Sequence, residues 1–281
     1  MVAPMKYAER TALGQPLIEE DHDLLVDMYR GFTPAGTFVS NYTYIVSTDG
    51  VDCYASSAYQ TIFGGPTDIG GVDGGDPAAV MQACLDALVS GGVIMIHGEI
   101  DCAGTGLTVD FSDITICGAG YSDKLIFNGV TGITVAQDIN YFSMHDLTLE
   151  EDSYGRTQTA ILFNGATAGH DIESCSMTNV HIFGWDTAIY GKYLWSSSFV
   201  CVDTLYSLTG LHIFGQSVNN NFVNCSFQYY QPGGAPAQEC VIVERNDGPD
   251  ESPESCNFSN CLIYGGTIGI YFRYAWFSKV E

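Results

Sequence analysis

The stretch GGDPAAVMQACLDALVSGGVIMIHG, residues 74–98, joins a short amphipathic helix directly to a buried strand. Asp76 is a favourable N-cap residue, and Pro77 suits the first position of a helix. Apolar residues then recur at the spacing of one helix face. Residues 93–96 are apolar without alternation and lie between glycines, so both faces of this strand are expected to be covered. A helix over residues 77–89 would then form a lid on the first of many stacked strands.

The composition favours a turn-rich β protein with a large core. The chain has 281 residues, of which 46% are hydrophobic, and it contains 32 glycines and 17 tyrosines. Only 9 lysines and arginines stand against 33 acidic residues, which gives a formal charge of −24. This charge repels phosphates and anionic lipids, so we expect neither nucleic acid nor a membrane surface as a partner.

Two further features of the sequence bear on where in the cell the protein is assembled. The first residues contain no apolar core of signal-peptide length, and no run of about 18 apolar residues suggests membrane insertion, so we expect assembly in the host cytoplasm without a signal peptide. Ten cysteines are spread along the chain without a C-x-x-C pair. We interpret them as small buried hydrophobic residues and expect no zinc site.

A repeat runs through the chain from residue 93 onward, as short apolar bursts separated by small polar residues. Five segments align, beginning at Met144, Met177, Phe199, Phe222 and Phe258. Two of the intervals are 22 and 23 residues, and the other two, 33 and 36, leave room for inserted loops. A period in the twenties indicates a solenoid, in which each repeat buries its apolar face against the next.

The third position of the aligned segments is a small polar residue in four of the five. Asparagine and aspartate tolerate left-handed backbone geometry and can stack as a ladder, so this position is expected to form a turn. The residues are Asp146, Asn179, Asn224 and Asn260. A β-sandwich with coincidental F-x-N-C segments is the alternative, but it gives no reason for the repeat.

The opening helix, the strand at 93–96 and the segment ITICGAG at 114–120 resemble the start of pectate-lyase-like right-handed β-helix proteins. In that family an amphipathic helix caps the first coil, and its members include polysaccharide lyases and phage tailspikes. The resemblance implies an all-β chain with a right-handed parallel β-helix over residues 77–281. A Gly-rich connection over residues 64–76 would precede it.

Residues 1–63 do not share the repeat and are expected to form a small N-terminal attachment arm with an extended segment, a short helix and a strand near 37–47. The motif R-x-x-L-G-x-P-L followed by an acidic helix is similar to the segment that joins many tail fibres and tailspikes to the tail. The resemblance implies contacts with tail or baseplate proteins through Arg10, Leu13, Gly14, Pro16 and Leu17. A helical arm packed on the β-helix is the alternative.

The sequence gives little support for catalysis. A pectate-lyase-type enzyme needs clustered cations, whereas the lysines and arginines of the repeat are isolated. A glycoside hydrolase needs two carboxylates about 5 to 9.5 Å apart. The chain offers two conceivable pairs, Asp186 with Asp203 and Glu239 with Glu244, but an acidic chain contains such pairs by chance. We therefore predict no catalytic residue, and interpret the histidines, His181 among them, as parts of the stacked strands.

Aromatic residues on or near the inserted loops form the candidate glycan site, because apolar rings stack on the C–H faces of sugars without needing charge. They are Tyr154, Trp185, Trp195, Tyr229 and Tyr230, and burial between coils or subunits is the alternative for each. No cofactor is expected. The candidates for calcium ligands are Asp73, Asp76, Asp247 and Asp250, and solvated turns are the alternative for these residues.

These observations predict a structural virion protein: a tail fibre or spike with a β-helix shaft, which binds a host receptor or surface glycan. Shafts of the type it resembles are usually homotrimers. The alternative is a polysaccharide-degrading enzyme of the same fold, a glycoside hydrolase or lyase acting on host surface polysaccharide. A cellular surface adhesin is a third possibility, which the expected lack of a secretion signal disfavours.

Overall fold

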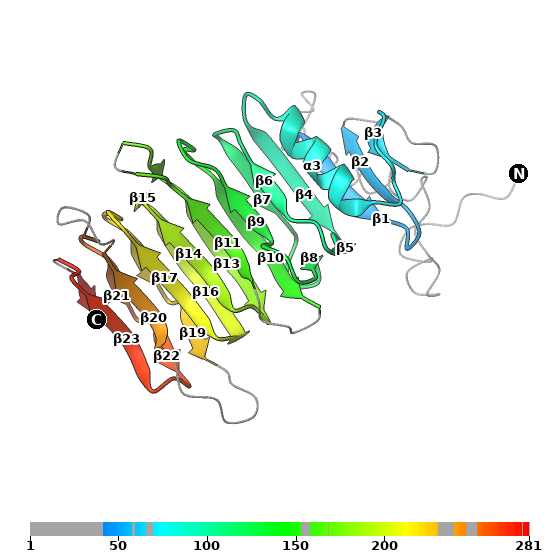
Figure 1. Ribbon diagram of the computed structural model, residues 1–281. Coiled ribbons are helices and arrows are strands. Elements are labelled where there is room, and N and C mark those ends of the chain that lie inside the picture. The colour runs from blue at the N-terminus through cyan, green and yellow to red at the C-terminus, as the bar shows by residue number, and fades with distance from the viewer. Residues whose placement is uncertain are drawn as a thin grey trace, which may run out of the picture.

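The computed structural model describes residues 42–57, 60–65, 70–152, 158–167, 169–229, 239–245, 252–276 and 278–280. Within these residues the chain winds into a parallel β-helix, with its coils stacked along one axis (Figure 1). The all-β parallel β-helix that the family resemblance implies is therefore confirmed.

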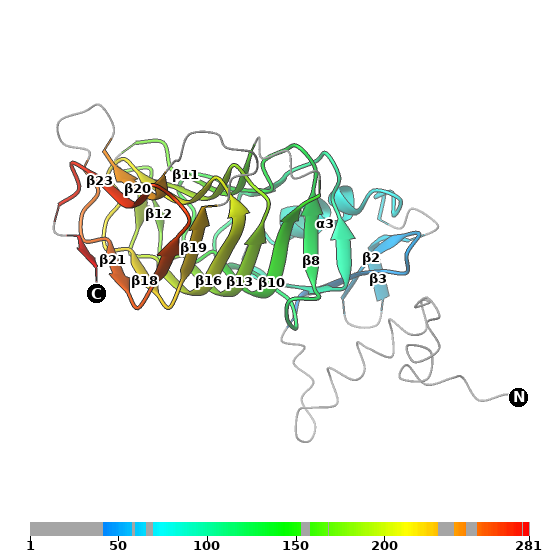
Figure 2. The ribbon, with the colours of Figure 1, turned by 90° about the horizontal axis from the view of Figure 1, so that it is seen from below.

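The larger sheet runs through the whole stack. Its central path consists of β3 (Gln60–Gly64), β2 (Cys53–Ser57), β1 (Tyr44–Thr48), β4 (Gly92–His97), β7 (Ile114–Cys117), β10 (Ser143–Glu151), β13 (Ser176–Phe183), β16 (Ser198–Ser207), β18 (Asn221–Val223), β21 (Asn257–Ser259) and β24 (Lys279–Val280). Beside it lie β5 (Glu99–Asp101), β8 (Lys124–Phe127), β19 (Ser226–Tyr229) and β22 (Leu262–Tyr264). The longest strands, β10, β13 and β16, cover both parts of this sheet (Figure 2).

Two smaller sheets complete the coils. The seven-stranded sheet contains β6 (Leu107–Val109), β9 (Ile133–Val135), β11 (Thr159–Asn164), β14 (Thr187–Lys192), β17 (Thr209–Phe214), β20 (Glu239–Glu244) and β23 (Ile268–Arg273). The two-stranded sheet pairs β12 (Ile172–Glu173) with β15 (Leu194–Trp195). In all three sheets, neighbouring strands from successive coils are parallel, except at the N-terminal end.

The register of the larger sheet follows the sequence repeat. Each of the first residues of the aligned segments pairs with its equivalent in the next coil: Met144 with Met177, Met177 with Phe199, Phe199 with Phe222, and Phe222 with Phe258. All of these side chains point into the core and are buried. The interior is thus filled by equivalent residues stacked one coil above another.

Three phenylalanines form a column in the core of the C-terminal half. The rings of Phe199 and Phe222 are stacked with centroids 4.8 Å apart, and those of Phe222 and Phe258 repeat this spacing at 4.8 Å. The separation equals the distance between neighbouring strands, so the ring column has the same period as the backbone ladder. These rings contribute both buried apolar area and ring stacking to the stability of the stack.

Helix α3 (Pro77–Ala87) covers the first coils, as predicted (Figure 1). The side chain of Asp76 accepts a hydrogen bond from the backbone N–H of Ala79, and the helix buries Met81 and Leu85 among other apolar residues. The amide of Gln82 makes two hydrogen bonds with the backbone of Thr108 in β6, at 2.9 and 3.0 Å. The helix is therefore held on the coil by these two hydrogen bonds as well as by its apolar face.

Strands β1 to β3 extend the stack beyond β4. β1 pairs with β4 in parallel, and β2 and β3 follow as antiparallel neighbours. The strand expected near 37–47 begins at Tyr44 in the described part of the chain. Residues 44–64, most of which the sequence prediction placed in the arm, are thus continuous with the larger sheet, because β1 supplies one more parallel strand. Residues 1–41 lie outside the described residues.

The turn predicted at the third motif position is present. Asp146, Asn179, Asn224 and Asn260 all have φ between +52° and +56°, and so does Cys201 in the remaining coil. The side-chain amide of Asn179 donates to Asp146 over 2.6 Å, and that of Asn260 donates to Asn224 over the same distance. Hydrogen bonds between coils therefore reinforce a turn that few residue types adopt without strain.

We expect Asn179→Ala to lower the free energy of unfolding by about 2 kcal/mol, because it removes the hydrogen bond to a carboxylate and places alanine in a left-handed turn. Asn179→Gly should cost less, because glycine adopts the left-handed turn without strain.

The hydrogen bond from Asn179 lowers the pKa of Asp146 from its usual 3.8. The charge-assisted part of this stabilisation is complete above that pH and is lost as the pH falls and Asp146 is protonated. Urea unfolding at pH 7 and pH 3 measures this: the difference between wild type and variant should shrink at pH 3, and an unchanged difference would contradict the role of the carboxylate.

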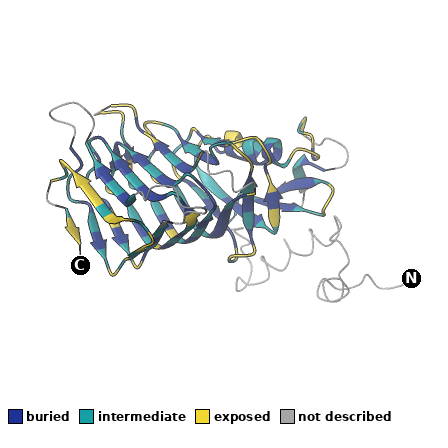
Figure 3. Ribbon diagram, turned by 60° about the horizontal axis from the view of Figure 1, so that its bottom comes forward, coloured by how far each residue is buried: buried dark blue, intermediate teal, exposed yellow. Residues whose placement is uncertain are grey.

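The C-terminal coil is the least covered part of the stack (Figure 3). Ile270 and Phe272 of β23 continue the inward positions of Val241 and Val243, which are fully buried, yet Phe272 is 38% exposed. Eight of the thirteen exposed large hydrophobic side chains in the described residues lie in this coil: Leu262, Tyr264, Ile268, Tyr271, Phe272, Tyr274, Trp276 and Val280. The last coil thus leaves more apolar side-chain surface exposed than the middle coils do.

All ten cysteines are free thiols, and eight of them are buried. This agrees with their interpretation as small hydrophobic residues, and only Cys201 is exposed. No helix in the described part of the chain is both long and apolar enough to span a membrane.

Candidate functional site

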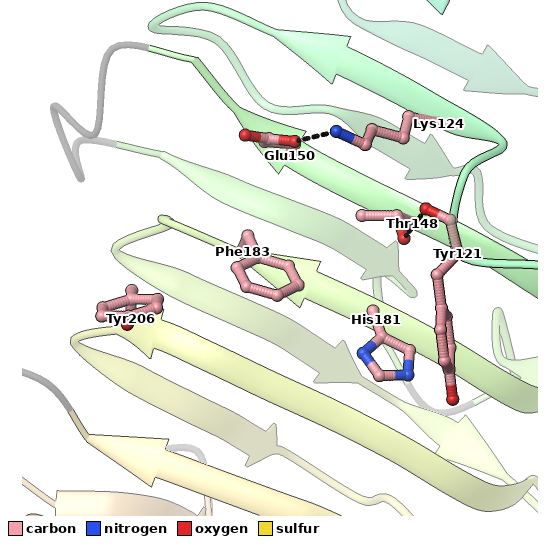
Figure 4. Close-up of a pocket in the computed structure, with 7 residues that line it drawn as sticks. All are labelled: Tyr121, Lys124, Thr148, Glu150, His181, Phe183 and Tyr206. Carbon is pink, nitrogen blue, oxygen red and sulfur yellow. Dashed lines mark hydrogen bonds and ion pairs between the residues drawn. The ribbon is translucent and has the colours of Figure 1, made fainter. Parts of the chain in front are cut away.

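An open hollow of about 400 Å³ lies on the outer face of the larger sheet, and we call it the aromatic groove. Its lining residues come from four successive coils: Tyr121, Lys124, Thr148, Glu150, His181, Phe183 and Tyr206. Figure 4 shows their side chains side by side on the strands β8, β10, β13 and β16 and on the loop before β8. The volume is within the range of ligand-binding clefts in proteins.

The groove is built from two neighbouring rows of outward side chains. One row runs through Lys124, Thr148, His181 and Asp203, which are direct partners in successive strands. The other row places Glu150 beside Phe183. Since side chains two residues apart on a strand share one face, both rows point away from the core. The repeat thus aligns side chains of successive coils along each row.

Aromatic rings line the groove from coil to coil. The rings of Tyr121 and His181 are in contact, with centroids 3.6 Å apart, and His181 is followed by Phe183 at 6.4 Å. Phe183 in turn stacks on Tyr206 at 6.2 Å. Tyr121 and Tyr206 are 53% and 42% exposed, so part of this aromatic surface is open to solvent.

The position of Tyr121 is fixed from both ends. The buried hydroxyl of Thr148 donates to its backbone carbonyl over 3.0 Å. The phenol of Tyr121 donates to the side-chain oxygen of Asn179 over 3.0 Å. Asn179 belongs to the turn ladder, so the geometry of the fold itself orients this ring.

Charged groups form one end of the groove. The ammonium of Lys124 lies 3.1 Å from a carboxylate oxygen of Glu99 and 3.1 Å from one of Glu150. These contacts, that with Glu99 first, raise the pKa of Lys124 above its usual 10.5. Lys124 is therefore protonated at neutral pH and can donate hydrogen bonds, but it cannot act as a general base.

On the next strands, His181 contacts the carboxylate of Asp203, at 3.5 Å between Nε2 and Oδ2. Burial lowers the pKa of His181 below 6.5, against the opposing effect of Asp203. The imidazole is therefore mainly neutral at pH 7. The groove and its border thus hold three carboxylates, of Glu99, Glu150 and Asp203, against the one ammonium.

The aromatic residues predicted from the sequence do not form this groove. Trp185 is fully buried and packs on Phe127 at 5.9 Å, so its prediction as an exposed glycan contact is wrong and the alternative of burial holds. Trp195 is half-buried in β15, where its indole N–H donates to the carbonyl of Gln216 over 2.7 Å. Tyr154 and Tyr230 lie outside the described residues, and of Tyr229 only the backbone, at the end of β19, is described.

The other predicted sites are only partly described. Arg10, Leu13, Gly14, Pro16 and Leu17 of the arm, and Asp247 and Asp250, lie outside the described residues. Asp76 caps helix α3, and the carboxylate of Asp73 accepts from the backbone of Gly75 over 2.9 Å, so both take part in local turns. In the described ranges, no three acidic, histidine or cysteine side chains are grouped so that they could hold a metal ion.

The carboxylate pairs considered for hydrolysis are not supported. Glu239 and Glu244 occupy the two ends of β20, five residues apart, which places them about 16 Å apart along an extended strand. That exceeds the separation of catalytic carboxylates. Asp203 faces His181 on β16, whereas Asp186 lies before β14 in the other sheet. His181 is a rung residue, as expected, but it faces outward into the groove.

No family model matches this chain, and no curated protein matches its sequence. Among solved structures, the mannuronan C-5 epimerase AlgE4 A-module of Azotobacter vinelandii aligns with a TM-score of 0.50 and 14% identity, over 72% of this chain and 65% of that module. ORF18 of Geobacillus virus E2 aligns with a TM-score of 0.47 and 12% identity, over 66% of this chain and 44% of that protein. The chain thus spans less than two thirds of either structure, and the similarity to the epimerase module concerns the fold alone.

Proposed function

We propose that this chain binds a neutral or amino-substituted saccharide in the aromatic groove, as the host-attachment part of a virion tail fibre or spike. One observation carries the binding proposal: the partly exposed rings of Tyr121, Phe183 and Tyr206 follow one another across successive coils, with carboxylates beside them. Ring faces contact the C–H faces of a sugar, and carboxylates accept hydrogen bonds from its hydroxyls. The coil spacing of about 4.8 Å lets neighbouring rings follow a short oligosaccharide.

The charge of the groove selects the class of saccharide. Glu99 and Glu150 already share the ammonium of Lys124, and Asp203 faces the mainly neutral His181. A uronate or sulfated sugar would therefore meet an excess of negative charge without a free cation among the seven lining residues. Hydroxyl or ammonium groups on the sugar would instead find acceptors.

An array of neutral, amino and acidic oligosaccharides tests this proposal with the purified chain. We expect binding to neutral or amino sugars. Binding confined to uronates or sulfated sugars, or to none, would contradict it.

The virion role rests on the N-terminal sequence, whose motif is similar to the attachment segment of tail fibres and tailspikes. A homotrimer of this shaft would have a mass of about 91 kDa, three times the 30.4 kDa of the chain. Light scattering on the full chain measures this mass, and a monomer would contradict the trimer.

Immunogold labelling of intact particles tests the location of the chain. Label on the tail is expected, and the absence of label from particles would contradict a place in the virion.

A polysaccharide-modifying enzyme is the second candidate, because Glu150 and the His181–Asp203 contact place acid and base groups along one groove. The fold suits such a role, since the similar A-module is named as an epimerase of mannuronan. Incubation of each array ligand with the chain, followed by mass spectrometry for cleavage and by proton NMR for epimerisation, which leaves the mass unchanged, separates the two candidates. Products that form with wild type and vanish with Glu150→Gln would favour the enzyme, whereas unchanged ligand favours binding alone.

A further inference from the structure

The repeated F-x-N-C segment places two cysteines at the same position of successive coils. In the larger sheet, Val223 pairs with Ser259, and Ser226 pairs with Leu262. Cys225 and Cys261 lie between these pairs at the same step of the register. The backbone N–H of Leu262 donates to the carbonyl of Cys225 over 2.8 Å, which confirms that the two residues are neighbours across the ladder.

The two thiols interact across the ladder, and a hydrogen bond between them is the first cause of the pKa shift of each. Each thiol also lies near carbonyl oxygens of its own or the preceding coil, with Cys225 Sγ 3.4 Å from that of Phe199 and Cys261 Sγ 3.4 Å from that of Phe222. Cys225 is buried, whereas Cys261 is partly exposed.

The backbone spacing suits a covalent bond between them. Neighbouring strands of a ladder lie about 4.8 Å apart, and disulfides join residues whose Cα atoms are roughly 4.4–6.8 Å apart. A bond between Cys225 and Cys261 would therefore need rotation of the side chains and no separation of the coils.

The contact also prepares one sulfur for reaction. The hydrogen bond from Cys225 lowers the pKa of Cys261 to about 7, and the same contact raises the pKa of Cys225. The thiolate is the attacking form of cysteine, so near neutral pH the partly exposed Cys261 can react first.

We propose that Cys225 and Cys261 form a dithiol site for low-molecular-weight disulfides such as oxidised glutathione. The Cys261 thiolate attacks the reagent disulfide, forms a mixed disulfide and releases one reagent thiolate. Cys225 loses its proton and attacks the Cys261 sulfur, which expels the second reagent thiolate. The two released thiolates take up the two protons that Cys261 and Cys225 lose, so two protein thiols are oxidised and one reagent disulfide is reduced to two thiols.

The bond would fasten the C-terminal end of the stack. It closes a 36-residue segment, the same step that separates Asn224 from Asn260, and it ties the coil of β22 to that of β19. The rung of β22 belongs to the exposed C-terminal coil. A crosslink over a loop of this length stabilises a folded chain chiefly by restricting the unfolded chain, so we expect Tm to rise by about 5–10 °C.

The test treats the folded full chain, with Cys201→Ser to remove the exposed thiol, with oxidised glutathione at pH 7.5. We expect the intact mass to fall by about 2 Da through loss of two hydrogens. Tryptic digestion separates Cys225 from Cys261 at Arg245. Fragmentation of the crosslinked peptide pair then distinguishes their bond from one through Cys240 or Cys256, which lie on the same two peptides. Treatment with dithiothreitol should restore the starting mass and Tm.

Cys225→Val is the matched control, because Val180 and Val202 occupy the equivalent buried position in preceding coils. In this variant the reaction should stop at a stable glutathione adduct on Cys261, with no crosslink and no gain in Tm. A second variant, Cys261→Ser, should take up no glutathione at this site. A crosslink involving other cysteines, no reaction at Cys261 in the folded chain, or a persistent adduct on Cys261 while Cys225 is present would overturn the proposal.

Discussion

Phe222→Ala is expected to lower the free energy of unfolding by about 3–5 kcal/mol, the usual cost of truncating a large buried ring. Phe222 is fully buried between Phe199 and Phe258, and its ring stacks on both at 4.8 Å. Alanine would leave a cavity in the middle of the column, and the stacked coils can close it only by shifting the backbone ladder. In a chain of this size the change should lower Tm by about 10 °C.

Thermal and urea unfolding of three variants measure this effect. Phe222→Leu keeps most of the volume and should cost only about 1 kcal/mol. Phe214→Ala removes a half-buried outward ring that packs beside Tyr190 on the other sheet, so it should also cost little. Equal losses for Phe222→Ala and Phe214→Ala would contradict a stack held mainly by its inward column.

The double variant Phe183→Ala/Tyr206→Ala should weaken saccharide binding by about 100-fold, since each aromatic contact in a binding site contributes on the order of 1–2 kcal/mol. The two rings stack at 6.2 Å and form the open end of the groove. Removing them leaves the carboxylates and Lys124 in place, so the loss reports on ring contact and not on charge. Isothermal titration with an oligosaccharide found on the array measures the affinity.

The control variant is Tyr190→Ala/Phe214→Ala, an outward aromatic pair at the same 6.2 Å spacing on the seven-stranded sheet. It should bind the saccharide as wild type does. Light scattering should show the same oligomeric state for both double variants. Loss of the oligomer in Phe183→Ala/Tyr206→Ala would instead assign these rings to a contact between subunits.

The core and the turns could be predicted because they repeat. Inward residues such as Met177 and Phe199 recur with the coil, and burial demands apolar side chains at each of these positions. The turn residues recur for a second reason, since left-handed geometry favours asparagine and aspartate. Helix α3 was predictable from Asp76, Pro77 and its apolar face.

The groove was missed because its residues share a position but no residue type. Four residues after the aligned starts come Thr148, His181 and Asp203, which the ladder places side by side. An alignment that continues to the sixth residue after each start would include this row and Phe183. Tyr121 could not have been found in this way, because it lies on a loop outside the alignment. Its contacts with Thr148, His181 and Asn179 place it at the groove.

Trp185 was misassigned for a related reason. Its neighbours Gly184 and Asp186 are typical of an exposed turn, but the chain there turns the indole into the core against Phe127. The sequence shows that an aromatic residue lies next to a turn, but the side on which the ring lies depends on how that coil closes.

The central claim is that the aromatic groove holds the saccharide, and a crystal structure of the chain with an oligosaccharide found on the array tests it most directly. The account predicts sugar rings over Phe183 and Tyr206, with hydroxyl groups within hydrogen-bond distance of Glu150 or Asp203. A sugar bound on another face, with the groove empty or covered by a second copy of the chain, would contradict it.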